Sequence, residues 1–473
     1  MHIRFLGGAS EVGRSGILVR DAKTFLFDYG VKIDDKPEYP LPSGKIDAFM
    51  LSHAHLDHSG FSPFLYHDSM PPTYCTEPTM RLAELLIEDS MKIARSEHYS
   101  MRFHNRQLKD LLQRYSPHAY GESIDFGDYE ITLHDAGHIC GSAITSVERR
   151  KDGKRIVYTG DFKLSPQLLQ NGAEVVKSDV LIMESTYATK EHGDREELAR
   201  SFIEGIKETI DNGGTALVPV FAVGRSQEIL ALIHKNGLSG RTFLDGMARS
   251  ATEIVIRNVE FIHNSSMLEE ALENVTVIER EHHRSRALEG GNIILTTSGM
   301  LSGGPVLSYI TKLNKESKIF LTGYQVEGTN GRRLMNGEPI MLGTQKYRVE
   351  TPFVMYDFSA HSGMEDLHEY ARRSNPEAIM CVHGSPENTA ALAEGLKEEG
   401  FNAYAPVNGN DINSVDVGDK VRLSNCYVSE FRGTPQLSTG KFGKIEVKEK
   451  GKGGAKEEFS EADDDLASMD PEE

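Results

Sequence analysis

Residues 53–58, which read HAHLDH, constrain the fold of this chain more than any other part of its sequence. They follow an apolar run at 45–51 that predicts a buried strand. Side chains two apart in an extended segment face the same side, so His53 and His55 can point at one ion. A turn after His55 directs the last two side chains of the hexapeptide to a neighbouring position. Imidazole and carboxylate are ligands of Zn²⁺ and Mn²⁺ at hydrolytic sites, so the segment predicts a two-metal hydrolase.

Six residues cannot complete two coordination spheres, so further ligands must lie elsewhere in the chain. Three candidates, His138, Asp161 and His383, each follow a predicted strand and each stand beside a glycine. Strands that run the same way deliver their ends to one edge of a sheet, and Asp161 is the natural bridging carboxylate. The seven expected ligands are His53, His55, Asp57, His58, His138, Asp161 and His383.

The order of the predicted elements indicates two domains, as expected for a chain of 473 residues. Short apolar runs between Gly or charged turns predict a strand-rich first part at 1–190. Strands and helices then alternate over 191–352, which predicts an inserted parallel α/β domain. Short apolar runs that predict strands resume over 353–425, so we expect this segment to complete the first domain.

The end of the chain differs in composition from the rest. The composition of 426–473 predicts an acidic, disordered tail. Its last part, 457–473, carries acidic residues and no basic one. Such a segment cannot bury enough apolar surface to offset the entropy of ordering. The net charge of −19 argues against unspecific coating of DNA. It does not exclude a local basic groove, because charge placement decides the field near a cleft.

The sequence contains no signal for a membrane or for export. No stretch approaches 18 consecutive apolar residues, and the N-terminus lacks a basic-then-apolar signal region, so we expect a cytoplasmic protein. The cysteines, Cys75, Cys140, Cys381 and Cys426, lie far apart without a CxxC pair. They predict buried small side chains in a reducing compartment.

Two sets of motifs now carry a family resemblance that covers residues 1 to about 410. The first set resembles the ordered motifs of the metallo-β-lactamase fold: Asp28, 53–58, His138 and Asp161. The second set resembles motifs A, B and C of the β-CASP nucleases: 184–187, 358–362 and 382–384. The resemblance implies an α/β protein, a metallo-β-lactamase αββα sandwich with an inserted β-CASP domain. Residues 8–15 resemble the cleavage-and-polyadenylation-specificity-factor-like branch more closely than bacterial ribonuclease J. The absence of a preceding KH-like region resembles the short archaeal members of that branch.

The resemblance also implies how the ligands are shared between two Zn²⁺ ions, with Mn²⁺ as the alternative metal. It assigns His53, His55 and His138 to one ion and Asp57, His58 and His383 to the other, with Asp161 bridging. Asp28 becomes a residue that orients a ligand.

Phosphodiester hydrolysis also needs a proton for the leaving oxygen, and His361 is the candidate donor because histidine titrates near neutrality. Glu184 can hold and polarise that imidazole, and the family resemblance supports the pairing. The alternative for Glu184 is a capping acid before a turn. Together with the metal ligand Asp57, these two residues are the expected catalytic groups.

Substrate contacts are expected at Gly-rich junctions in the insertion. Residues 221–226 join a predicted strand to a helix, whose N–H groups can bind phosphate, and Arg225 can add a bidentate contact. Ser298, in a second Gly-rich loop, and Ser362, beside His361, are further candidates. The plain alternative for each is an ordinary turn or a solvated side chain.

The expected function is a two-metal ribonuclease that cuts single-stranded RNA, endonucleolytically, 5′→3′ exonucleolytically or both. A DNA-directed β-CASP nuclease and a non-catalytic RNA-binding scaffold of a processing complex are the alternatives. Small-molecule hydrolysis is disfavoured by the long insertion. The expected partners are RNA, proteins of RNA decay or processing and, from the resemblance alone, a second copy of the chain.

Overall fold

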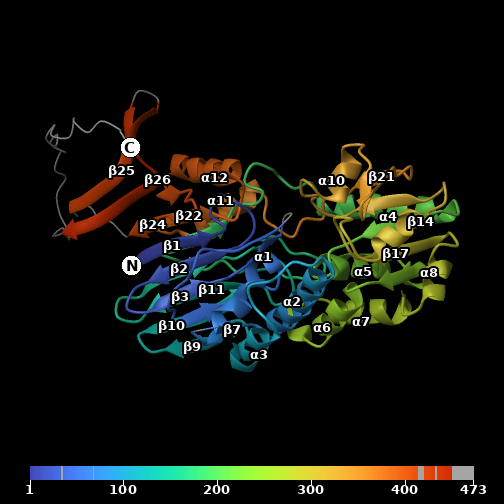
Figure 1. The fold of residues 1–473 in the computed structure, drawn as a ribbon, viewed down its shortest axis with the longest axis horizontal. Coiled ribbons are helices and arrows are strands. Elements are labelled where there is room, and N and C mark those ends of the chain that lie inside the picture. The colour runs from blue at the N-terminus through green and yellow to red at the C-terminus, as the bar shows by residue number, and fades with distance from the viewer. Residues whose placement is uncertain (34–35, 68, 414–419, 432–433, 450–473) are drawn as a thin grey trace. The chain divides into compact units, whose positions relative to one another are not determined.

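The computed structural model describes residues 1–33, 36–67, 69–413, 420–431 and 434–449. The chain divides into two compact units, Phe5–Gly409 and a smaller one made of Met1–Arg4 and Asn410–Glu473. Figure 1 shows the elements in both.

Two β-sheets form the centre of the larger unit. The first has the strand order β1-β2-β3-β6-β7-β8, and the second has the order β23-β22-β13-β12-β11-β10-β9. The first sheet consists of β1 (His2–Gly7), β2 (Gly16–Arg20), β3 (Thr24–Phe27), β6 (Ala48–Met50), β7 (Thr73–Cys75) and β8 (Tyr115–Pro117). The second consists of β9 (Ser123–Phe126), β10 (Tyr129–Asp135), β11 (Ala143–Arg149), β12 (Lys154–Tyr158), β13 (Val180–Glu184), β22 (Ala378–Val382) and β23 (Ala403–Tyr404).

Aromatic side chains pack the two sheets face to face. The ring of Phe25 on β3 lies 5.0 Å from that of Tyr129 on β10. Phe27 lies 5.4 Å from Tyr158 on β12. These rings are buried, so the space between the sheets is a packed core, as in other sheet sandwiches.

Helices cover the outer face of each sheet (Figure 1). Helices α2 (Glu77–Ser96) and α3 (Asn105–Arg114) bury their apolar stripes in the same cluster as the first sheet. Helices α11 (Met364–Ser374) and α12 (Pro386–Glu398) do so against the second sheet. The αββα sandwich expected from the resemblance is thereby confirmed.

The insertion is built on one parallel sheet with the order β16-β15-β17-β14-β18-β21. Its strands are β14 (Thr215–Pro219), β15 (Thr242–Asp245), β16 (Thr276–Val277), β17 (Asn292–Thr296), β18 (Lys318–Leu321) and β21 (Phe353–Met355). Its helices are α4 (Arg195–Asp211), α5 (Arg225–Lys235), α6 (Ala248–Ile256), α7 (Ser265–Asn274), α8 (Glu281–Ala287), α9 (Val306–Ile310) and α10 (Asn330–Met335). Every residue of β14 is buried, as expected for a parallel strand covered on both faces.

The shorter elements of the larger unit connect these layers. They are α1 (Leu56–Ser59), the 3₁₀ turns Ser62–Tyr66, Ser239–Arg241 and Val259–Phe261, and the strands β4 (Lys32–Ile33), β5 (Pro37–Glu38), β19 (Ile340–Leu342) and β20 (Gln345–Tyr347).

The return to the first domain lies later than the expected residue 353. Strand β21 pairs in parallel with β18 and is the edge strand of the insertion's sheet. A three-residue strand carries too little pattern to show which of two sheets it joins. The second part of the sandwich therefore begins after Met355.

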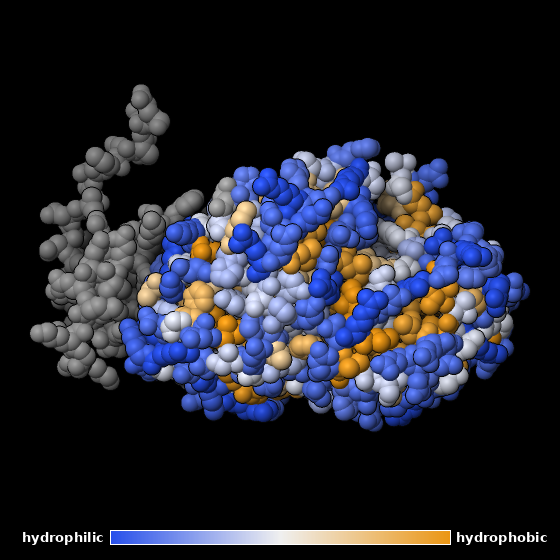
Figure 2. Space-filling view, turned by 90° about the horizontal axis from the view of Figure 1, so that it is seen from below, coloured by the Kyte–Doolittle hydropathy of each residue, from blue (hydrophilic) through white to orange (hydrophobic). Residues whose placement is uncertain are grey.

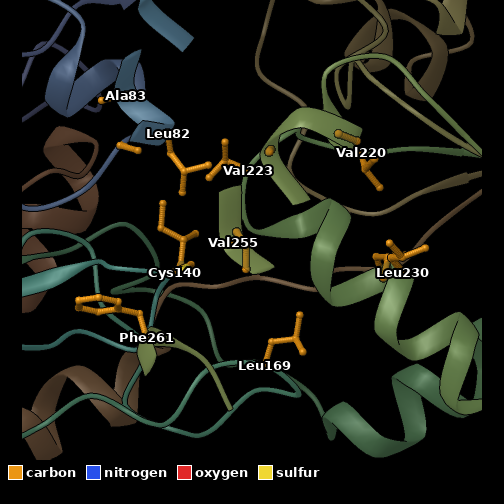
Figure 3. Packing of buried hydrophobic residues seen from close by; sticks show 14 of the residues in the cluster. Leu82, Ala83, Cys140, Leu169, Val220, Val223, Leu230, Val255 and Phe261 are labelled. Atoms are coloured by element: carbon orange, nitrogen blue, oxygen red, sulfur yellow. The ribbon is translucent and has the colours of Figure 1, made fainter. Parts of the chain in front are cut away.

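One hydrophobic cluster joins the insertion to the sandwich. Leu82 of α2 and Cys140 belong to the same cluster as Val223, Val255 and Phe261 of the insertion (Figure 3). All five are buried. The insertion is therefore packed on the sandwich through a continuous apolar core, and it is not an appendage on a linker.

In the smaller unit, β24 (Asp411–Asn413) pairs antiparallel with the first residues of β1. Strands β25 (Lys420–Phe431) and β26 (Thr434–Glu449) form an antiparallel hairpin. The expectation of disorder was therefore wrong for the paired residues within 426–449. Apolar and polar residues alternate in parts of both strands, a signal that an average over composition hides. Residues 450–473 lie outside the described part of the chain.

The face drawn in Figure 2 is mostly hydrophilic, with apolar residues in patches between polar ones. Within the described ranges, no helix combines the length and apolar character that crossing a bilayer requires. Cys75, Cys140 and Cys381 are buried free thiols, as expected.

Candidate metal centre and active site

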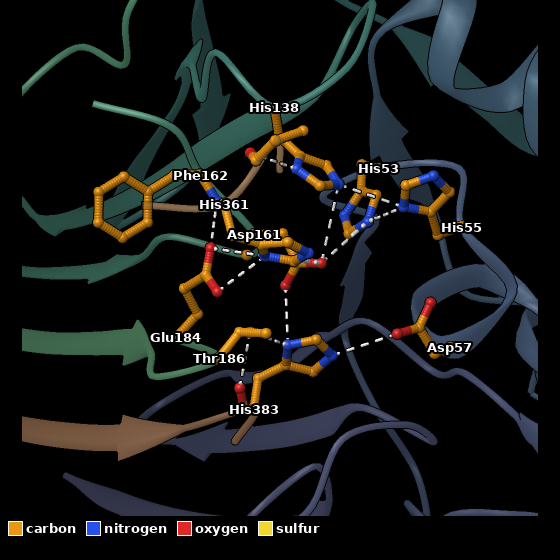
Figure 4. A network of polar contacts seen from close by, with 12 residues as sticks. His53, His55, Asp57, His138, Asp161, Phe162, Glu184, Thr186, His361 and His383 are labelled. Carbon is orange, nitrogen blue, oxygen red and sulfur yellow. Dashed lines mark hydrogen bonds and ion pairs between the residues drawn. The ribbon is translucent and has the colours of Figure 1, made fainter. Parts of the chain in front are cut away.

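The expected ligands follow four strands. His53 comes after β6, His138 after β10, Asp161 after β12 and His383 after β22. Strands β12 and β22 run parallel to β13, and β10 runs the same way because it is antiparallel to β11, which is antiparallel to β12. The carboxyl ends of β10, β12 and β22 therefore share one edge of the second sheet. The ligand side chains that follow these strands meet there with His53 (Figure 4).

The first group of ligand atoms belongs to His53, His55, His138 and Asp161. His55 Nδ1 lies 3.1 Å from His53 Nε2 and 3.2 Å from His138 Nε2. Asp161 Oδ2 lies 3.5 Å from His53 Nε2 and 3.8 Å from His138 Nε2. Ligands about 2.0–2.1 Å from a tetrahedral zinc ion are roughly 3.3–3.4 Å apart, so this spacing suits one.

The second group belongs to Asp57, His58, Asp161 and His383. His383 Nε2 lies 3.2 Å from both His58 Nε2 and Asp57 Oδ2. His58 Nε2 lies 3.3 Å from Asp161 Oδ1. Asp161 thus turns one oxygen toward each group, the arrangement of a bridging carboxylate.

Hydrogen bonds on the far side of the rings fix which nitrogen faces each group. His138 Nδ1 donates to the carbonyl oxygen of Ala360 over 2.9 Å. His58 Nδ1 donates to Asp28 Oδ2 over 2.7 Å. Each ring therefore presents Nε2 to the centre, as metal-binding histidines do when an outer acceptor orients them.

Asp28 is completely buried and holds several donors at once. Its Oδ1 accepts from Ser52 N, and its Oδ2 accepts from Ser52 Oγ and Tyr158 Oη, each over 2.7 Å. Ser52 Oγ lies 3.0 Å from His53 Nδ1, so Asp28 reaches ligands of both groups. Sequence reasoning singled out Asp28 but missed Ser52 and Tyr158.

A close backbone approach positions α1, which carries Asp57 and His58. The Cα of Gly30 packs so near this turn that an added Cβ would lie 1.7 Å from the Asp57 carbonyl oxygen. Only glycine fits there without a backbone shift. No sequence pattern pointed to this glycine.

The buried charges shift the ionisation of the cluster. Burial holds the pKa of His53 and His138 well below the usual range of histidine. Burial would also lower the pKa of His58, but the carboxylates of Asp161, Asp57 and Asp28 raise it well above that range. Burial opposes ionisation of Asp161, yet His383 and His58 hold the pKa of its carboxyl well below normal, so it is anionic.

These residues fit two divalent cations. Asp161 Oδ1 is buried and makes no hydrogen bond within the described ranges, although His383 Nδ1 is only 3.0 Å away. An orphaned carboxylate oxygen among converging imidazoles is costly unless a cation satisfies it. Nitrogen and oxygen donors of this kind suit zinc or manganese.

Glu184 and His361 form a pair beside the two groups. Glu184 ends β13, is buried, and its two oxygens lie 3.1 and 2.9 Å from His361 Nδ1. Glu184 Oε1 also accepts from Phe162 N over 2.8 Å, so both of its oxygens are engaged. Burial alone would lower the pKa of His361, but Glu184 and Asp161 raise it to about 9.

Of the expected substrate contacts, Arg225 lies beside the loop of His138. It lines the same small cavity as His138 and Ala360. Its Nε is buried and has no hydrogen-bond partner among the residues described. Burial and the neighbouring Arg195 lower the pKa of Arg225 to about 10. Ser298 is half-buried in the loop after β17.

Ser362 does not fit its expected role as a phosphate contact. Its side chain is completely buried, and its Oγ accepts from Leu164 N over 3.0 Å. A hydroxyl closed off from solvent and already bonded to the backbone orders the segment around His361 instead.

Comparisons with known proteins agree with this geometry. Residues 24–208 match the family described as beta-lactamase superfamily domain, 226–334 match the Beta-Casp domain, and 346–406 match the Zn-dependent metallo-hydrolase RNA specificity domain. The chain belongs to the metallo-β-lactamase hydrolases that carry a β-CASP domain, and the family resemblance is confirmed.

Within that class, the similar relatives include several archaeal proteins. The chain is 39% identical to "Probable RNase MJ4" of Methanocaldococcus jannaschii, over 89% of this chain and 100% of the relative. It is 34% identical to "RNase aCSPSF2" of Saccharolobus solfataricus, over 87% and 85%. It is 33% identical to "Transcription termination factor FttA" of M. jannaschii, over 84% and 69%.

A solved structure shares the fold at low identity. A crystal structure of a protein of unknown function from Enterococcus faecalis matches with a TM-score of 0.58 and 15% identity. The match covers 87% of this chain and 99% of that one.

Proposed function

We propose that this chain is a ribonuclease that hydrolyses phosphodiester bonds of single-stranded RNA with two zinc ions. The observation that carries the proposal is the carboxylate of Asp161, shared between two groups of ligand atoms beside the Glu184–His361 pair. The match to an RNA specificity domain and the relatives named RNases support RNA as the substrate. With that substrate, the proposed place of action is the cytoplasm, beside other proteins of RNA processing or decay. The proposed second copy of the chain rests on the family resemblance alone.

In this proposal the first ion is held by His53, His55 and His138 and the second by Asp57, His58 and His383, with Asp161 between them. When bound, such a pair of ions lowers the pKa of water and stabilises the charge of the transition state.

The chain's own residues supply the proton transfers. Glu184 holds Nδ1 of His361, which leaves Nε2 free to donate a proton to the leaving oxygen. Asp57 has the most exposed carboxylate of the ligand set, 30% against 2% for Asp161, so it faces the open side. There it can accept a proton from the attacking water.

The insertion offers a place for the phosphates of the strand. Neighbouring strands β14 and β17 send their connections in opposite directions, to β15 and to β18. Ligands of parallel α/β sheets bind at the carboxyl ends of strands at such a switch point. Arg225 opens α5, directly after the loop that follows β14, and Ser298 stands in the loop that follows β17. We therefore assign both residues contacts with RNA phosphates.

The test uses a 5′-labelled linear RNA, a circular RNA and a single-stranded DNA of the same sequence, with Zn²⁺ or Mn²⁺. We expect RNA to be hydrolysed in preference to DNA. Cutting of the circle assigns an endonuclease, and digestion of the linear RNA alone assigns a 5′→3′ exonuclease. Asp57→Ala should abolish hydrolysis, whereas Asp125→Ala, at an exposed position, should not. Intact RNA in every reaction would contradict the proposal.

A further inference from the structure

Gln167 holds the loop that carries His138. Its amide Nε2 donates to the carbonyl oxygens of Gly137 over 2.8 Å and of His138 over 3.1 Å. Gln167 is buried, so these bonds do not compete with water. A metal ligand in a loop depends on such support, because loops are otherwise the least rigid part of a site.

The insertion holds Gln167 in turn. Arg195, at the start of α4, donates from Nη2 to Gln167 Oε1 over 3.1 Å. Glu228, in the first turn of α5, accepts from Leu169 N over 2.7 Å and from Leu168 N over 3.1 Å. Arg195 Nη2 lies 3.4 Å from Glu228 Oε2, so the buried carboxylate has a cationic partner.

The same arginine also binds the backbone segment that accepts a hydrogen bond from the ring of His138. Arg195 Nη1 donates to the carbonyl oxygen of Ser359 over 3.2 Å. The next carbonyl, that of Ala360, accepts from His138 Nδ1. Two routes from the insertion therefore converge on one ligand, one at its backbone and one at its ring.

We propose that Gln167 is a positioning residue for His138, and that Arg195 and Glu228 hold it so that the insertion sets the geometry of the first metal group. The proposal rests on the metal assignment of the proposed function. A hydrogen-bonded network of this kind fixes one arrangement, and removing one member leaves the others unsatisfied. Loss of an outer partner of a metal ligand typically weakens metal binding by about 10–100-fold.

The test is metal binding by Gln167→Ala in the full chain, with two readouts. Competition with a chromophoric chelator measures the affinity for each Zn²⁺ equivalent, and the electronic spectrum of bound Co²⁺ reports ligand geometry. His138 belongs to the first group and not to the second. We therefore expect one equivalent to weaken by about 10–100-fold with a changed Co²⁺ spectrum, while the other is unchanged. Glu228→Gln should weaken the same equivalent, which keeps the test usable if Gln167→Ala fails to fold.

The matched control is Asn264→Ala. Asn264 Nδ2 donates to the carbonyl oxygen of Leu168 over 2.9 Å. The control thus removes a bond between the insertion and the same segment without touching Gln167, and we expect wild-type metal affinity. Equal effects in control and test variants, or two unchanged equivalents in Gln167→Ala and Glu228→Gln, would overturn the proposal. Wild-type protein that binds no second equivalent would overturn the metal assignment itself, and this proposal with it.

Discussion

Nδ1 of His361 is held by both oxygens of Glu184. Its remaining nitrogen is the group available to the leaving oxygen. We expect His361→Ala to lower kcat by about 10²–10⁴-fold, the usual contribution of general acid catalysis. The bound metal, measured by atomic emission, should stay unchanged. A variant that keeps wild-type kcat would show that the proton comes from elsewhere.

The charge of Glu184 has a separate consequence for the pH profile. The acid must be protonated to act, so activity falls as pH rises through the pKa of His361, and Glu184 is the strongest of the groups that raise that pKa. Glu184→Gln keeps a hydrogen-bond partner without the charge. The alkaline limb of kcat against pH should therefore move to lower pH in this variant, and an unmoved limb would contradict the pairing.

Asp135, which precedes the His138 loop, predicts a pH dependence of stability. Burial raises the pKa of its carboxyl to about 6, although Gly137 N donates to it over 2.8 Å. The folded pKa exceeds the unfolded one, so the stabilisation is complete below about pH 4 and is lost as pH rises past 6. Metal-free Asp135→Asn should be more stable than wild type by up to about 3 kcal/mol at pH 8, and equal to it at pH 4. Urea unfolding at both pH values measures this, and equal stability at pH 8 would contradict it.

At the scale of elements, the start of α5 is fitted to the loop of His138. Gly224, before this helix, has φ +80°, and an added Cβ would lie 2.4 Å from Ile139 Cγ2. We expect Gly224→Ala to displace Ile139 and to lower RNA hydrolysis, in addition to about 1–2 kcal/mol of backbone strain.

Gly237 provides the control, because its φ is +72° and nothing lies within 4 Å of an added Cβ. Gly237→Ala should show the strain in thermal unfolding without the loss of activity. Equal rates for the two variants would show that the close approach to Ile139 has no bearing on the site.

Local pattern predicted the elements best where they are long. The alternation of strands and helices expected over 191–352 is present, with long helices at Arg195–Asp211 and Arg225–Lys235. Pairing partners are a long-range property, so the sequence did not show that Phe353–Met355 joins the insertion's sheet. The hairpin of β25 and β26 was missed because its apolar residues are few and its strands stabilise each other through backbone bonds.

The candidate site divides in the same way. The seven expected ligands come together because each either lies in the hexapeptide 53–58 or directly follows a strand. Both features can be recognised in the sequence. Ser52, Tyr158 and Gln167 were missed because their hydrogen bonds depend on how distant segments pack. Ser362 was misassigned because sequence adjacency to His361 does not show which way a side chain faces.

At the scale of the larger unit, the sandwich and the insertion should unfold in one transition, because they share a core. Metal binding should raise the Tm of that single transition. The cluster that contains Leu82 and Val223 spans the sandwich and the insertion, so neither can lose its core alone. Zn²⁺ at about 100 times its dissociation constant should add about 2.7 kcal/mol per site, because only the folded chain assembles the ligands. Removing the metal with a chelator should therefore lower the Tm of one cooperative transition, measured by calorimetry, and abolish RNA hydrolysis. Two separate transitions, of which only one responds to the metal, would show that the insertion unfolds independently of the site that it covers.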